Sequence, residues 1–245
     1  MQSFEIQTEI VELPSKGLLY PKDSPLREGT VEMKYMSAKE EDILTNQNYI
    51  KKGIVLDKVI QSMITTENVN YNDLLLGDKD ALMIAARILG FGSEYSFEYN
   101  GEAETVDLSK LDAKPFKSEL FEEGKNEFLY TLPHSKCEIT FKLLTHEDDK
   151  KIDRELEGLK KVSRDESFDI STRLKRTITS VNGDRESKTI RAFVDNGGLI
   201  TLDSKALRKY IKEIQPGVDL TFFPGDGESK SPIPIRLDFF WPDFE

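Results

Sequence analysis

The sequence predicts an α+β protein, and three patterns support this fold class. Residues 81–89 are apolar on nearly every side, which is typical of a buried helix. Residues 94–108 alternate around Asn100–Gly101, the strongest short signal for a β-hairpin. The last hundred residues mix helical and strand-like periods and end in aromatic residues. We therefore expect a helical N-terminal half with flanking strands and hairpins, then a mixed α/β C-terminal half with an aromatic terminal strand.

Length and charge narrow the class of protein further. The 245 residues are enough for one large domain or two small ones. A net charge of −11 repels phosphate backbones, which argues against nucleic acid as the main partner. Apolar runs are too short for a membrane span, and the acidic, alternating first residues do not resemble a signal peptide. Cys137 is the only cysteine, which rules out an intrachain disulfide.

Four segments are expected along the chain. Residues 1–36 hold N-terminal strands and a Pro/Gly loop, and residues 37–92 form a helical core. Residues 93–145 contain β-hairpins and a connection, and residues 146–245 contain helices and a C-terminal hairpin.

The first strand is predicted over residues 3–11, where Phe4, Ile6 and Ile10 fall on one face. This pattern indicates a half-buried strand, and it leaves open whether the strand is an ordinary sheet edge or an interaction arm. A second strand is predicted over residues 29–36, with its apolar side chains on one side: Val31, Met33 and Tyr35.

Between these strands lies an unusual loop, Leu13–Pro21. Pro14 and Pro21 favour extended backbone before them, and Gly17 allows a turn between them. The loop is therefore stiff, and its apolar side chains must pack against something. They either contact a partner or close the chain's own core, and they are Leu18, Leu19 and Tyr20.

Three helices are predicted in the next segment. Ser37 and Glu40 have the spacing of a capping box, so a helix is expected over 38–44. Apolar spacing predicts another near 54–65. Asp78 is expected to cap the buried helix, which ends at Gly90. Arg87, the single charge within residues 81–89, is expected to snorkel or to pair with a carboxylate.

Residues 109–125 have a weak pattern and are interpreted as a connection. Alternation predicts a hairpin over 128–143 with its turn at 133–136. A helix is then expected to begin near Thr145 and Asp148. Its apolar stripe is narrow, so it either skirts the core or docks on a partner helix. The candidate contact residues on this stripe are Ile152, Leu156 and Leu159.

The C-terminal elements have less regular signals. Asp169 is expected to cap a helix whose apolar face runs from Ile170 to Val181, and Asp203 or Ser204 to cap the last helix. Residues 190–200 are ambiguous. A β-like ending carries the aromatic residues Phe239, Phe240, Trp241 and Phe244.

Catalytic patterns are absent from the sequence. It has no phosphate-binding loop, dinucleotide fingerprint or nucleophile elbow. His134 and His146 have no motif partner, so each is expected to be a solvated or capping residue, and Cys137 a buried structural thiol. One cysteine and two distant histidines cannot supply a structural zinc site. We therefore predict no enzyme activity, no catalytic residues, no metal, no cofactor and no small-molecule substrate.

Four segments carry a family resemblance. They are LPSKGLLYP, AKEEDILTNQNYIKKG, GDKDALMIAARILGFG, and LDSKALRKYIKEIQPGVDL followed by FFWPDF. In this order and spacing they are similar to the baseplate hub proteins of T-even-type contractile-tailed bacteriophages. That family includes structural members and assembly factors, and the resemblance covers nearly the whole chain.

The resemblance implies a non-enzymatic structural component of a phage tail baseplate hub. Such a component acts through protein–protein contacts with other baseplate and tail hub proteins, and belongs to the virion after assembly in the host cytoplasm. The alternative is an assembly factor, or chaperone, that is absent from the mature virion. A tail-tip cell-wall hydrolase is a third hypothesis. Such an enzyme would need a clustered acid pair or a Cys/His pair, and the sequence offers neither. The expected contact surfaces are the loop, the helix stripe and the aromatic tail: Leu18, Leu19, Tyr20, Ile152, Leu156, Leu159, Phe240, Trp241 and Phe244.

Overall fold

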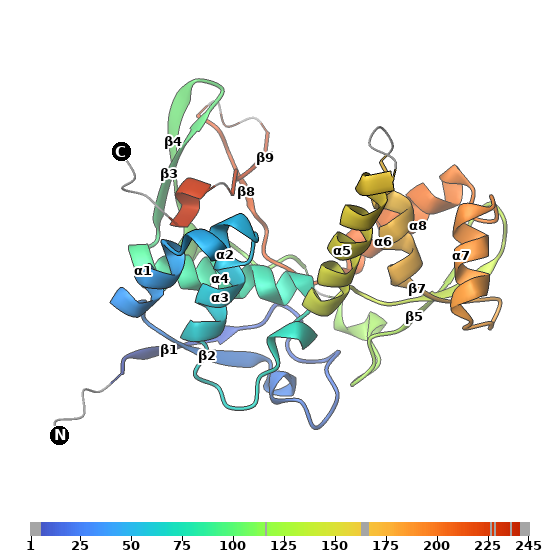
Figure 1. Cartoon of the computed structure of the whole chain (residues 1–245), viewed down its shortest axis with the longest axis horizontal. Coiled ribbons are helices and arrows are strands. Elements are labelled where there is room, and N and C mark those ends of the chain that lie inside the picture. The colour runs from blue at the N-terminus through green and yellow to red at the C-terminus, as the bar shows by residue number, and fades with distance from the viewer. Residues whose placement is uncertain are drawn as a thin grey trace.

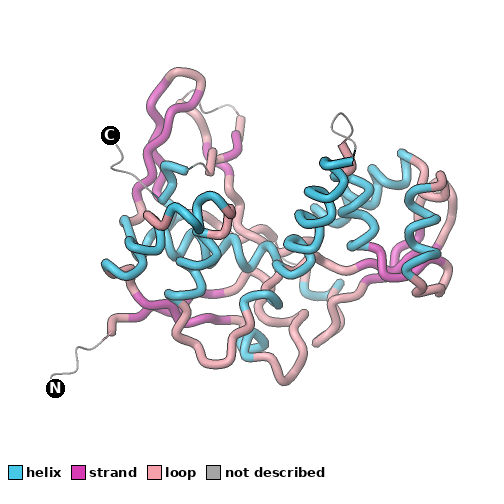
Figure 2. The backbone as a smooth tube through the Cα atoms, viewed as in Figure 1, coloured by secondary structure: helices cyan, strands magenta, loops and turns pink. Residues whose placement is uncertain are grey.

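The computed structural model describes residues 6–115, 117–162, 167–225, 227, 229–235 and 237–240. Within these ranges the chain is an α+β protein, as predicted, with eight α-helices and several small antiparallel sheets. Two lobes are visible in Figure 1, one around helices α1–α4 (within residues 38–91) and the other around helices α5–α8 (within residues 146–214). Figure 2 shows that helices and short strands occur in both lobes. Among the helices described, none has both the length and the apolar character needed to cross a membrane.

The first lobe combines a two-stranded ribbon with four helices. Strand β1 (Thr8–Glu12) pairs antiparallel with β2 (Thr30–Lys34). The helices follow as α1 (Ala38–Leu44), α2 (Gln47–Lys51), α3 (Val55–Met63) and α4 (Leu76–Phe91). The capping box predicted at Ser37 is confirmed. The prediction of a buried helix is also confirmed, because Leu82 and Ala86 of α4 are fully buried.

The predicted burial of the first strand is wrong. Ile6 and Ile10 are 66% and 71% exposed, and Phe4 lies outside the described residues. The register places half-buried Val11 opposite Val31 and exposed Glu9 opposite Met33, so the odd-numbered positions of β1 share the face on which β2 is buried. Val31 and Met33 of β2 therefore decide which face of the ribbon is buried, and Ile10 falls on the other face. Tyr35, predicted to lie beside them, is 42% exposed.

The hairpin predicted around Asn100–Gly101 is confirmed. Strands β3 (Glu94–Tyr99) and β4 (Glu102–Asp107) pair antiparallel. Asn100 and Gly101 have φ values of 52° and 86°, the positive region that a two-residue hairpin turn requires.

The end of the chain returns to the first lobe beside this hairpin (Figure 1). Strands β8 (Thr221–Phe222) and β9 (Ser231–Pro232) form a short ribbon. The ring of Phe222 lies 5.0 Å from that of Phe97, and the ring of Phe239 lies 4.9 Å from that of Tyr95. Residues Leu237–Phe240 form a 3₁₀ helix, so the predicted terminal strand is wrong there. This turn lets neighbouring Phe239 and Phe240 both enter the core, which a strand would prevent.

The second lobe is built on a three-stranded sheet with the order β5-β6-β7. The hairpin of β5 (Phe128–Thr131) and β6 (Glu138–Phe141) is confirmed. Helix α6 (Asp169–Thr177) ends before β7 (Ile178–Val181), so the helix predicted to reach Val181 is too long. Ile178 and Val181 instead pair with β6. The other helices are α5 (His146–Val162), α7 (Ser187–Asp195) and α8 (Thr201–Ile214).

Three charged side chains form hydrogen bonds with groups other than the predicted ones. Helix α4 begins at Leu76 and α8 at Thr201, so Asp78 and Asp203 lie inside the first turns and do not cap them. Asp203 accepts hydrogen bonds from the backbone N–H groups of His134 and Ser135, each at 2.9 Å. Arg87 is 2% exposed, which excludes snorkelling, and it donates to the carbonyls of Gly92 and Glu94.

Candidate functional site: a groove between the lobes

A buried carboxylate fixes the loop Leu13–Pro21 to the start of α4. Asp78 accepts hydrogen bonds from the Ser15 N–H (2.9 Å), the Ser15 hydroxyl (2.6 Å) and the Tyr20 hydroxyl (2.6 Å). The Tyr20 oxygen in turn accepts from the N–H of Leu75 at 3.0 Å. Burial raises the pKa of Asp78 against the effect of its donors, and burial followed by the charge of Asp78 raises the pKa of Tyr20. The loop therefore satisfies polar groups inside the fold.

This network decides where two of the predicted contact residues lie. Leu19 and Tyr20 are both 3% exposed, so they close the chain's own core and are not free to contact a partner. Leu18 is half-buried. The sequence left this alternative open because no local pattern shows that Tyr20 has a buried partner 58 residues away.

The other predicted contact residues are also largely internal. Ile152 and Phe240 are 0% and 1% exposed. Leu156 and Leu159 are half-buried on α5. Trp241 and Phe244 lie outside the described residues.

The loop forms one wall of a groove of about 640 Å³ between the lobes. Residues 19–25 supply that wall, and residues 68–75 supply a second from the first lobe. The second lobe contributes Lys142 and the first turns of α5, from Thr145 to Lys151. Gly124 and Asn126 complete the groove in the segment that links the lobes.

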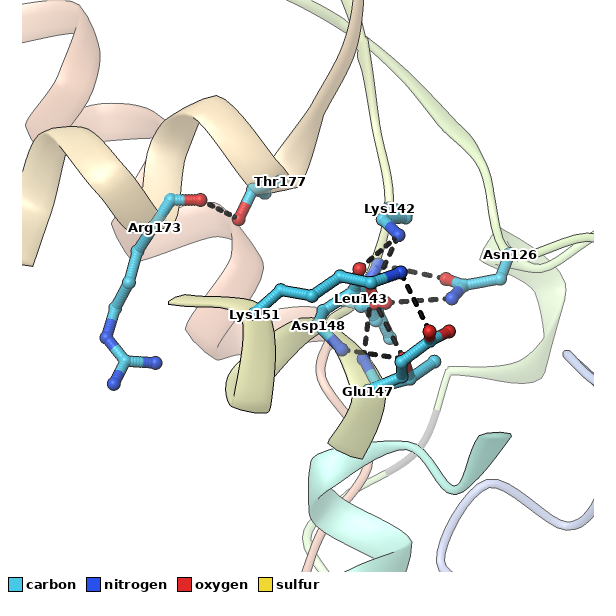
Figure 3. A network of polar contacts seen from close by, with 9 residues as sticks. Asn126, Lys142, Leu143, Glu147, Asp148, Lys151, Arg173 and Thr177 are labelled. Carbon is cyan, nitrogen blue, oxygen red and sulfur yellow. Dashed lines mark hydrogen bonds and ion pairs between the residues drawn. The ribbon is translucent and has the colours of Figure 1, made fainter. Parts of the chain in front are cut away.

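Charged side chains of the groove are arranged around the start of α5, as Figure 3 shows. Asp148 forms a capping box with Thr145 and an ion pair of 2.7 Å with Lys142. Glu147 pairs with Lys151 at 2.8 Å one helical turn later, and both are well exposed. The Asn126 amide joins the linking segment to Leu143 by two hydrogen bonds, of 2.8 Å and 2.9 Å.

A second cluster joins the lobes beside the groove. The Lys79 ammonium lies 2.8 Å from Asp57 and 3.2 Å from Nδ1 of His146, and Nε2 of His146 lies 3.3 Å from Asp57. Because an ammonium group only donates, Nδ1 accepts and Nε2 carries the proton. The Tyr71 hydroxyl also donates to Asp57, at 3.1 Å.

This cluster corrects the prediction that His146 is solvated. Its side chain is 3% exposed and meets the Tyr71 ring edge-on at 4.8 Å. Burial, followed by the charge of Lys79, lowers the pKa of His146. The neighbouring backbone forms a β-bridge between Leu75 and Thr145, so the cluster lies at a rigid junction.

The remaining candidates for chemistry lie apart from the groove. His134 is exposed on its turn, as predicted. Cys137 is only half-buried, its thiol lies 3.4 Å from the Asn182 side chain, and burial raises its pKa. Within the described ranges, no group of three or more His, Cys, Asp or Glu side chains is placed to hold a metal ion.

Comparisons with protein-family models, with curated proteins and with solved structures found no match for this chain. The groove was not anticipated from the sequence, because its lining comes from separate segments spread between Leu19 and Lys151. The one available signal was the loop Leu13–Pro21, whose stiffness requires a packing surface.

Proposed function

We propose that this chain is a non-enzymatic structural component of a contractile phage tail baseplate hub, and that it binds another hub protein through the groove between its lobes. The proposal places the chain in the virion after assembly in the host cytoplasm. One observation carries it: the segment LPSKGLLYP, which resembles the hub family, ends at Leu19–Pro21 in one wall of a groove large enough for a partner's polypeptide segment.

The walls of the groove are held in place before any partner arrives. Asp78 fixes the loop from inside, and the Leu18 carbonyl accepts from the Gly124 N–H at 2.7 Å and from Arg27 at 2.7 Å. Arg27 also pairs with Glu123. A preformed site loses less conformational entropy on binding than a mobile one. This rigidity favours a structural contact.

The surface chemistry of the groove suits a polypeptide. Pro21 and Pro25 contribute apolar atoms, while the amide of Asn68 can both donate to and accept from a peptide backbone. Glu147 and Lys151 lie on the rim with side chains 53% and 41% exposed. An exposed helical ion pair contributes little stability, so these charges are free to set the orientation of a partner.

The test exchanges the two rim charges. A Glu147→Lys, Lys151→Glu double variant keeps an ion pair on α5 but reverses the pattern that a partner meets. We expect it to fold normally and to lose at least about tenfold in affinity for co-expressed hub proteins of the same phage, because reversed charges oppose the partner's. Complexes recovered by affinity purification and titrated by calorimetry give the measurement.

The matched control is the pair Lys209–Glu213 on α8, which has the same helical spacing and is highly exposed. Reversing that pair leaves the groove unchanged and is expected to leave the affinity unchanged. Equal binding by both double variants would overturn the assignment of the contact to the groove.

A further inference from the structure

One edge of the β1–β2 ribbon has no pairing strand among the residues that the structure describes. Gln7 accepts from the N–H of Tyr35, and Leu13 donates to Gly29, so the odd-numbered residues of β1 direct their backbone groups toward β2. In an antiparallel pair the alternate residues direct theirs away. Thr8, Ile10 and Glu12 therefore present N–H and C=O groups at the outer edge, and no hydrogen bond from the described part of the chain reaches them.

The opposite edge of the same ribbon is protected. The Thr65 N–H donates to the Glu32 carbonyl at 2.9 Å, and the Glu32 N–H donates to the Thr66 hydroxyl at 2.7 Å. A bridge between Met33 and Ile64 completes this cover. The described part of the fold thus covers the β2 edge and leaves the β1 edge open.

The open edge also carries exposed apolar side chains. Ile6 and Ile10 lie on the outward face of β1, and they are the two most exposed large hydrophobic residues in the described part of the chain. Free strand edges are usually blunted by charge, proline or a bulge, because they template pairing with other strands. Two isoleucines at such an edge favour the addition of a strand.

The charges around the edge favour one kind of partner. Glu9 and Glu32 bond only to hydroxyl groups in the described structure, and Glu12 has no bonded partner there. Lys34 of β2, which lies opposite Thr8, is paired with Glu40 at 2.8 Å. Two copies of β1 brought together would place Glu9 and Glu12 of both copies at one seam, which is unfavourable. A basic strand would neutralise them.

We propose that the outer edge of β1 accepts an extended strand from a partner protein, in which apolar residues alternate with lysine or arginine. Backbone hydrogen bonds to Thr8, Ile10 and Glu12 extend the ribbon to three strands, and the apolar side chains of the added strand pack beside Ile6 and Ile10. This surface is separate from the groove between the lobes.

A peptide of alternating valine and lysine tests the proposal directly. We expect it to bind the full chain and to slow amide hydrogen exchange at Thr8, Ile10 and Glu12. The same peptide with N-methylated backbone amides lacks the donors for a ladder, and we expect binding at least about tenfold weaker. Equal binding of the two peptides would overturn strand addition and leave only charge attraction.

An Ile10→Pro variant locates the site. Proline at this position removes an N–H that faces outward, so the bonds to β2 remain. Leu129→Pro is the matched control: the bond from the Leu132 N–H to the Cys137 carbonyl places Leu129 at the outward positions of edge strand β5, where it is 63% exposed. We expect Ile10→Pro to weaken binding at least about tenfold and Leu129→Pro to leave it unchanged, with both variants folded by circular dichroism.

Two results would contradict the proposal. Equal binding by the two proline variants would show that the peptide binds elsewhere. Dimerisation of the unmodified chain in sedimentation experiments, abolished by Ile10→Pro, would show that the edge pairs with a second copy.

Discussion

Gly77, at the start of α4, lies directly against the backbone carbonyl of Pro216, where the chain returns from the second lobe to the first. A Cβ atom on Gly77 would lie 1.8 Å from the Pro216 oxygen. Gly77 and Pro216 belong to two of the four segments on which the proposed function rests, and a third of them reaches the same place through the bond from Ser15 to Asp78. These segments therefore meet inside the fold at the start of α4.

The Gly77 contact predicts that the stability of the protein depends sharply on the size of the side chain at this position. Gly77→Ala should destabilise the protein by about 1–3 kcal/mol or more, because the backbone must move to relieve the overlap. Gly158→Ala is the control: Gly158 lies within α5 and has no atom within 4 Å of its Cβ position, so alanine should stabilise by up to about 1 kcal/mol. Urea unfolding midpoints measure both changes, and two variants of equal stability would contradict the contact.

The loop is predicted to depend on one hydroxyl group. Tyr20→Phe removes the atom that links the Leu75 N–H to Asp78, leaving buried polar groups without a partner. We expect a loss of about 1–3 kcal/mol in the free energy of unfolding. Tyr35→Phe removes a hydroxyl that bonds to Glu9 at the surface and should change stability by less than about 0.5 kcal/mol. Similar losses in both variants would show that Tyr20 has no special role.

The hydrogen bonds of Glu40 predict that the free energy of unfolding falls in acid. Burial raises the pKa of its carboxyl, but hydrogen bonds from Lys34, Ser37 and Ser62 outweigh this effect and lower the pKa to about 2. Because the pKa in the folded state is below that of the unfolded chain, this stabilisation is present above about pH 4.5 and is lost as the pH falls toward 2.

The test compares two glutamine variants across that pH range. Glu40→Gln should cost about 2–3 kcal/mol at pH 6 and much less near pH 2.5. Glu41→Gln, at the exposed neighbouring position, should cost little at either pH. A penalty for Glu40→Gln that stays constant with pH would contradict the assigned role of this carboxylate.

The buried position of His146 predicts a second dependence of stability on pH, at higher pH than that of Glu40. Its pKa is lowered in the folded state, so the unfolded chain binds the proton first as the pH falls below about 6.5. Stability from the neutral imidazole is therefore present above that pH and lost below it, with a slope of at most about 1.4 kcal/mol per pH unit. His146→Gln should flatten the change between pH 7 and 5, whereas His134→Gln at the exposed turn should not. Identical slopes in both variants would contradict the buried cluster.

Local signals predicted the elements that depend on neighbours in sequence. The capping box of α1, the Asn100–Gly101 hairpin and the buried face of α4 are set within a few residues, and all three are confirmed. The helix predicted to reach Val181 is longer than α6. The spacing of Leu174, Ile178 and Val181 fits a helix, but Ile178 and Val181 belong to a strand that pairs with β6.

The features that the sequence did not predict depend on contacts between residues that are far apart in the chain. Alternation in β1 was visible, but β2 determines which face is buried, so Ile6 and Ile10 were assigned to the wrong side. In the same way, the sequence around Tyr20 fits a partner contact as well as a core position. The buried hydrogen bond from Tyr20 to Asp78 shows that it is a core position. The groove depends on contacts of this kind between both lobes and has no signature in any single segment.

Quantitative mass spectrometry tests the proposed function most directly, on purified mature particles of the contractile-tailed phage that the proposal takes as the source of this chain. A structural hub component is expected to give peptides in a fixed ratio to known tail proteins, and to keep that ratio through successive purification steps. Peptides confined to lysates and assembly intermediates, with none in mature particles, would contradict a structural role and identify the chain as a transient assembly factor.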